Sequence, residues 1–69
     1  MTTERRHMEK YTLKVIRAMH DLNQGEMADR LGISRFYYNM IENKHKPMTA
    51  GVLVRICKEF DLNLNQIDA

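Results

Sequence analysis

Apolar residues recur every three or four positions along most of this chain of 69 residues, and no segment alternates with a period of two. A period of about 3.6 residues is that of amphipathic helices, whereas half-buried strands alternate. Capping and helix-ending residues divide the pattern into five expected helical segments: about 8–22, 24–31, 35–43, a fourth after Thr49 and a short turn from Asn63. The pattern therefore predicts an all-α fold with one small core.

Residues 23–43 carry the most specific pattern in the chain. Asn23 and Glu26 form a capping-box sequence, and Gly32 ends the helix that they begin. Ser34 is a good N-cap for the next helix. The apolar positions of the two helices fall on their facing sides: Met27, Ala28, Leu31, Ile33, Tyr38 and Ile41. A small residue at the closest approach and a glycine at the turn suit a sharp crossing, so this segment predicts a helix-turn-helix.

Length and composition exclude several classes of protein. A chain of 69 residues has room for one domain, so no separate catalytic or ligand-sensing domain is expected. The single cysteine, Cys57, cannot form an internal disulfide, and the three histidines lack ligand spacing, so neither a metal nor another cofactor is expected. No apolar run approaches the roughly 20 residues that span a bilayer. We therefore expect a soluble, cytoplasmic protein with no membrane partner and no small-molecule effector.

The charge is unevenly distributed, although the net charge is only +2. Residues 1–17 carry five basic and two acidic side chains, and residues 34–48 carry three and one. The positive excess thus includes the second half of the expected motif, where it would attract a DNA backbone. The first nine residues are expected to be a flexible tail, which leaves residues 10–69 as the single domain.

In these features the chain resembles the Cro and phage-repressor family of helix-turn-helix domains, the Xre family. The similarity is carried by NQGEMADRLGISR, by IEN at the end of the third helix, by the basic loop before Pro47 and by LVRICKEFDLNLNQI. It covers about residues 11–68. The resemblance implies a compact five-helix, lambda-repressor-like domain that binds operator DNA as a homodimer. No nucleophile, base and orienting group are recognisable, so no enzymatic activity is expected.

Positions that match the family assign roles to residues around the motif. Arg17 and Glu42 correspond to a pair that joins the first and third helices by a largely buried salt bridge. Gln24 matches a glutamine at the start of the second helix, where a helix N-terminus attracts an anion. The residues expected to contact DNA phosphates are Asn23, Gln24, Tyr37, Asn43, Lys44 and Lys46. For Asn23 and Gln24 a plain capping role is the alternative, and Lys44 replaces a glycine that is usual in the family.

The third helix is expected to read bases in the major groove. The residues assigned to this readout are Arg35, Phe36, Asn39 and Met40. Arg35 could donate two hydrogen bonds to a guanine, and Asn39 could pair with adenine or contact a phosphate. Phe36 and Met40 depart from the family, whose outward positions here are often polar. They either touch thymine methyl groups or form a protein-binding patch.

Together these features predict a small transcriptional regulator that binds double-stranded DNA sequence-specifically, a repressor of the phage or mobile-element type. The alternative is a protein-interaction module, such as an antirepressor or an antitoxin-like partner, that uses the apolar outer face of helix 35–43. Dimerisation is expected through residues 60–67, with Met48 nearby. The apolar side chains there that exceed the needs of one small core are Leu62, Leu64 and Ile67.

Overall fold

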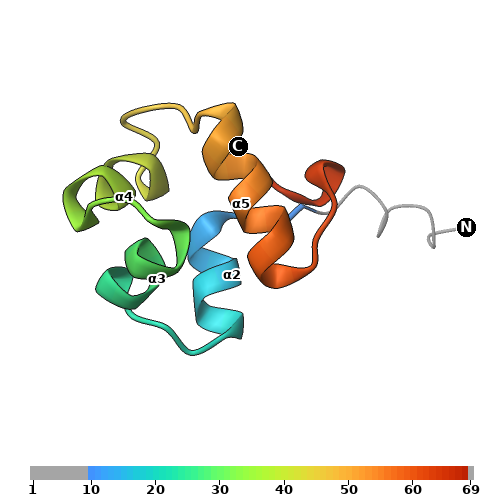
Figure 1. Cartoon of the computed structure of the whole chain (residues 1–69), viewed down its shortest axis with the longest axis horizontal. Coiled ribbons are helices and arrows are strands. Elements are labelled where there is room, and N and C mark those ends of the chain that lie inside the picture. The colour runs from blue at the N-terminus through green and yellow to red at the C-terminus, as the bar shows by residue number, and fades with distance from the viewer. Residues whose placement is uncertain (1–9, 69) are drawn as a thin grey trace, which may run out of the picture.

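Four α-helices and one short 3-10 turn make up the part of the chain that the computed structural model describes, residues 10–68. The helices are α2 (Leu13–Met19), α3 (Gln24–Leu31), α4 (Arg35–Glu42) and α5 (Ala50–Phe60), and the turn is η1 (Leu64–Gln66). α3 packs against both α4 and α5 (Figure 1). The all-helical prediction is confirmed for these residues, whereas the flexible tail predicted for residues 1–9 lies outside them.

Each of the four helices begins at a side-chain cap. The capping oxygens accept hydrogen bonds from the backbone N–H three residues further on, at 2.8 to 3.3 Å, and belong to Thr12, Asn23, Ser34 and Thr49. A cap of this kind stabilises a helix by about 1 kcal/mol. Because helices of 7 to 11 residues are too short to persist alone, the caps and the shared core hold them together.

The first helix is shorter than the sequence pattern predicts. The expected span was about 8–22, but α2 has only seven residues and Thr12 caps it. The residue before the cap, Tyr11, is not helical because it forms a parallel β-bridge with Ile67. The Tyr11 N–H and carbonyl both bond to the C-terminal segment, at 2.7 and 2.9 Å. Met19, the last residue of α2, is 55% exposed.

The fifth predicted helix is a single 3-10 turn, η1, so that part of the fold prediction is wrong. Asn63 does begin it, and its backbone N–H donates to Gln66 Oε1 at 2.8 Å. The turn ends at Ile67, which is extended, pairs with Tyr11 and is only 3% exposed. Ile67 therefore belongs to the core of this chain and is not spare apolar surface. Leu64 is the exposed large apolar side chain of that region, at 58%.

One hydrophobic core connects the helices. Among the described residues its buried members are Leu13, Ile16, Met27, Ala28, Leu31, Tyr38, Ile41, Val52, Ile56, Phe60 and Ile67. They include all the apolar positions assigned to the facing sides of the motif except Ile33, which is partly buried against the same core. Since burial of one large apolar side chain stabilises by about 1.5–3 kcal/mol, the crossing of α3 and α4 is fixed mainly from within this core.

Positive φ angles mark the ends of segments. They are found at Asp21, Gly32, Lys44 and Asp61, with values of 56°, 70°, 61° and 55°. Gly32 makes the turn between α3 and α4, where the absence of a Cβ removes the steric penalty. Lys44 adopts the same left-handed conformation at the position where the family usually has a glycine. A residue with a Cβ costs about 1–2 kcal/mol in this conformation, so the loop carries some strain there.

Candidate nucleic-acid interface

The two sides of α4 differ sharply. Tyr38 and Ile41 are buried, and Tyr37 is half-buried against the core. Successive residues of a helix are about 100° apart, so the direction opposite Tyr38 and Ile41 passes through Phe36 and Asn43. Both of these side chains are exposed. α4 therefore offers solvent one face whose centre is Phe36 and Asn43.

All four residues predicted to read bases lie on this outward face or at its margins. Arg35 and Phe36 are exposed, and Phe36 is 72% accessible, the most of any large apolar side chain noted on the described surface. Asn39 and Met40 are half-buried. The helix thus presents a cation, an aromatic ring and an amide within its first five residues.

The start of α3 lies next to this face and is shaped by a complete capping box. Asn23 Oδ1 accepts from the Glu26 N–H at 2.8 Å, and Glu26 Oε1 accepts from the Asn23 N–H at 2.9 Å. The capping role considered for Asn23 is therefore present. Its side-chain amide nitrogen is not used in the box, and the N–H groups of Gln24 and Gly25 have no partner within the helix. These donors, with the positive end of the helix dipole, suit an anion.

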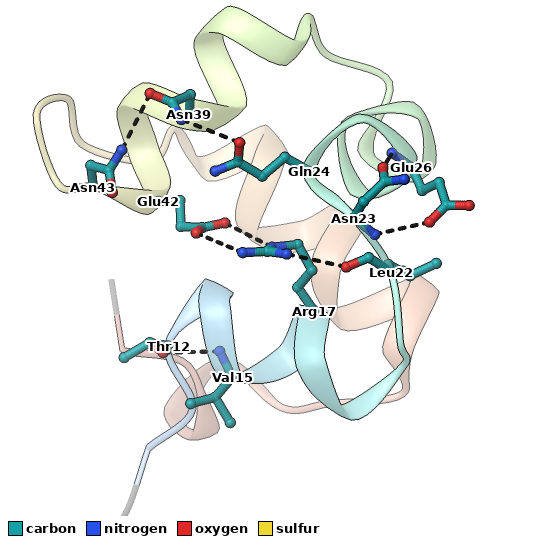
Figure 2. Close-up of polar contacts among 10 residues, drawn as sticks. All are labelled: Thr12, Val15, Arg17, Leu22, Asn23, Gln24, Glu26, Asn39, Glu42 and Asn43. Atoms are coloured by element: carbon teal, nitrogen blue, oxygen red, sulfur yellow. Dashed lines mark hydrogen bonds and ion pairs between the residues drawn. The ribbon is translucent and has the colours of Figure 1, made fainter.

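A chain of side-chain amides connects α3 to the outward face of α4 (Figure 2). Asn39 Nδ2 donates to Gln24 Oε1 at 3.4 Å, and Asn43 Nδ2 donates to Asn39 Oδ1 at 3.2 Å. Two predicted phosphate contacts and one predicted base contact are thereby joined. Each amide that bonds to a neighbour has a fixed orientation, so the chain prepares these groups for a ligand before it arrives.

An ion pair joins α2 to α4 next to the amide chain. Arg17 Nε and Nη2 donate to the two carboxylate oxygens of Glu42, each at 3.0 Å, and Arg17 Nη1 donates to the Leu22 carbonyl at 3.2 Å (Figure 2). The structure thus joins the two residues that the family resemblance pairs. The Glu42 side chain is 5% exposed and that of Arg17 is 19% exposed. The two-pronged geometry sets the angle of α4 relative to α2.

The ion pair changes the ionisation of its members and of Tyr38 beside it. Burial alone would raise the pKa of Glu42, but the hydrogen bonds from Arg17 lower this pKa below its ordinary value. Burial, followed by the Glu42 carboxylate, raises the pKa of Tyr38. The buried Tyr38 hydroxyl itself has no partner within hydrogen-bond geometry. Glu42 therefore stays ionised as a structural anion and Tyr38 stays neutral.

The loop after α4 carries two more of the predicted phosphate contacts, Lys44 and Lys46, and they lie outside the amide chain. Lys44, His45 and Lys46 are exposed and form one wall of a hollow of about 330 Å³ beside the start of α2. Lys44 Nζ is 3.4 Å from Asp68 Oδ2. Lys44 is thus held toward the C-terminal segment, whereas Gln24, Asn39 and Asn43 belong to the amide chain.

Two residues near the interface had no role in the sequence analysis. Asp68 forms the pair with Lys44, and no short-range pattern connects residues that are 24 positions apart. Gly25 lies near the Arg35 side chain, because a Cβ added to it would be 3.9 Å from Arg35 Cδ, an ordinary van der Waals distance.

Within residues 10–68, no three His, Cys, Asp or Glu side chains are grouped as metal ligands would be. Across that range, none of the helices combines the length and apolar character that crossing a membrane requires.

The arrangement of α3 and α4 defines a helix-turn-helix domain. Two short helices are joined by a glycine in the left-handed conformation, and the second helix has one side exposed to solvent. The family described as Helix-turn-helix matches residues 13–67. Because this match covers most of the chain, the protein belongs to that family, in its Xre type, as its sequence motifs indicated. The family is one of DNA-binding regulators.

A curated relative is similar over most of the chain. It is the "Propionyl-CoA carboxylase regulator" of Cereibacter sphaeroides, with 34% identity over 55 residues, which are 80% of this chain. The chain spans only about 12% of the length of that relative. No solved structure matches the chain significantly.

Proposed function

We propose that this domain recognises a specific operator in double-stranded DNA, with α4 in the major groove, and represses transcription by occupying it. The observation that carries the proposal is the outward face of α4, because the core fixes the opposite face and leaves Arg35, Phe36 and Asn39 toward a partner. A major groove about 12 Å wide admits such a helix. The name of the relative as a regulator supports a role in transcriptional control.

Phosphate contacts near both ends of α4 would fix the position of this helix along the DNA groove. Gln24 and the free N–H groups at the start of α3 lie on one side, and Asn43, Lys44 and Lys46 lie at the other end of the helix. Asn23 and Tyr37 complete the set, through an amide and a phenol. To bind phosphate, Lys44 would exchange its exposed partner Asp68, and such exposed pairs contribute little.

Base contacts would come from the first two turns of α4. Arg35 can donate two hydrogen bonds to the O6 and N7 atoms of guanine. Asn39 uses one donor and one acceptor in the amide chain, so its second N–H and remaining lone pair are available for adenine. Phe36 and Met40 add apolar surface toward thymine.

The proposal includes a homodimer on two half-sites about 34 Å apart. One domain of this size covers too little DNA for tight specific binding. The exposed Leu64 and the half-buried Leu62 and Met48 support a contact through the C-terminal part. Sedimentation that shows a monomer at high micromolar concentration, both free and on operator DNA, would contradict the dimer.

A protein-interaction module is the second candidate, favoured by one observation. Phe36 is 72% exposed and lies one turn from Met40, and contiguous exposed apolar side chains can mark a protein-binding site. Tyr37, however, is packed against the core, which reduces the available apolar patch to Phe36 and Met40. This patch is small compared with the roughly 800 Å² that each partner buries in a stable protein complex.

Selection from a random duplex library, followed by fluorescence anisotropy over a salt series, tests the proposed function. We expect one enriched motif and an affinity that falls steeply with salt. Arg35→Ala should lose discrimination at one base pair, and Gln24→Ala should weaken binding to all duplexes alike. Lys58→Ala, a change of exposed charge on α5, is the matched control. An unenriched library, with no effect of either variant, would refute operator recognition.

A further inference from the structure

Phe36 occupies the most prominent position on the proposed reading face. Its ring is 72% exposed although it is the centre of the outward side of α4, opposite the buried Tyr38. A hydrogen-bonding residue at this position could recognise any base edge, whereas a phenyl ring can recognise only an apolar one. A phenylalanine at this position therefore restricts the possible contacts in the groove to apolar groups of the bases.

The major groove displays one apolar group, the C5-methyl of thymine. Cytosine lacks it, but 5-methylcytosine carries the same methyl at the same ring position. A phenyl ring that contacts the methyl cannot distinguish these two pyrimidines by that contact. It does distinguish both from uracil and from unmodified cytosine.

We propose that Phe36 makes operator affinity depend on the C5-methyl group of one pyrimidine, so that methylation of cytosine at that position strengthens binding. The ligand group is a 5-methylpyrimidine in duplex DNA. This inference rests on the proposed operator recognition and adds a sensitivity to DNA methylation.

The neighbours of Phe36 favour DNA over a protein as the partner of the ring. Arg35 precedes it at the start of α4, and Asn39 and Asn43, further along the outward side, belong to the amide chain that starts at Gln24. A cation and several amides around one ring match a groove lined with acceptors and a single methyl. The apolar surface of the ring is extended only by the half-buried Met40 one turn further on, and this patch is small for a folded protein partner.

The first experiment uses the duplex enriched by selection and replaces each thymine in turn with deoxyuridine. This change removes only the methyl and keeps the base pair. We expect one position where the wild-type protein loses about four-fold in affinity, which corresponds to one methyl group withdrawn from apolar contact. Phe36→Ala should bind the thymine duplex as weakly as the wild type binds the uracil duplex, and should be insensitive to the replacement.

The second experiment places cytosine or 5-methylcytosine at that position, each opposite guanine. The wild type should prefer the methylated duplex about four-fold, Phe36→Leu should keep part of the preference, and Phe36→Ala should have none. Met19→Ala removes another exposed apolar side chain, 55% accessible, at the end of α2 and serves as the control. Circular dichroism of each variant confirms that it is folded.

The outcomes separate this inference from the proposed function. If a motif is enriched but no uracil replacement changes affinity, operator recognition stands and methyl sensing is refuted. If Phe36→Ala retains the methyl preference, another residue reads the methyl and the assignment is overturned. If Phe36→Ala binds every duplex as the wild type does, the ring serves a protein partner and the inference also fails. A library without enrichment overturns both proposals.

Discussion

Removal of Arg17 should destabilise the domain in a way that depends on pH. In Arg17→Met the Glu42 carboxylate, whose side chain is only 5% exposed, loses the two hydrogen bonds and the positive charge of its only ionic partner in the described structure. Breaking a buried pair from one side costs about 3–5 kcal/mol, because the remaining charge is uncompensated. Since the Arg17 side chain is still 19% exposed, we expect the lower end, about 3 kcal/mol at neutral pH.

The sign of the pH dependence follows from the pKa of Glu42. In the wild type Arg17 lowers this pKa, so the stabilisation is complete above the unfolded value of about 4.3 and is lost as the pH falls through the lower folded value. Without Arg17 the burial of Glu42 raises its pKa instead. The variant then loses stability as the pH rises from about 4.3 through the raised folded value. The difference between the two proteins should therefore be largest at neutral pH, decrease as the pH falls, and disappear only below the lowered pKa of Glu42 in the wild type.

Urea unfolding followed by far-UV circular dichroism, at several values from pH 4 to 7, measures this difference. Arg55→Met is the matched control, because Arg55 pairs with Glu59 at 3.5 Å on the exposed side of α5. The control should cost at most about 0.5 kcal/mol at every pH. A loss for Arg17→Met that is the same at all pH values would refute the assigned role of Glu42 as a buried, arginine-dependent anion.

Three further substitutions test other features of the fold. Tyr38→Phe removes a buried hydroxyl without a hydrogen bond, so its free energy of unfolding should stay equal or rise by up to about 1 kcal/mol; a larger loss in urea unfolding would reveal a bond to the ion pair. Asp61→Gly removes the steric cost of a side chain in the left-handed conformation after α5. It should raise the free energy of unfolding by about 1 kcal/mol, and the melting temperature with it, whereas Asp61→Ala should not. Lys44→Gly relieves the same strain but removes a cation, so we expect higher stability in urea together with weaker operator binding by anisotropy. A variant that is more stable and binds the operator at least as tightly would contradict the phosphate role.

The scaffold of this domain was predictable because burial constrains it. Met27, Ala28 and Tyr38 lie in the core at the crossing, as their spacing indicated, and Gly32 has the left-handed conformation that its position at the turn requires. The helix ends were less predictable. α2 is shorter than the helix that the apolar periodicity predicts, because Tyr11 pairs with a segment more than fifty residues away. No local sequence pattern indicates such a pairing.

The interface was predictable in membership but not in geometry. Periodicity places Phe36 and Asn39 outward, yet the bonds from Asn43 through Asn39 to Gln24 depend on the distance between α3 and α4, which only the folded core sets. The same dependence explains why the scaffold and the reading face are linked. A change in the Arg17–Glu42 pair would tilt α4, and the amide chain would then lose its geometry before any DNA contact is altered. A variant such as Arg17→Met should therefore weaken operator binding even under conditions where the domain remains folded.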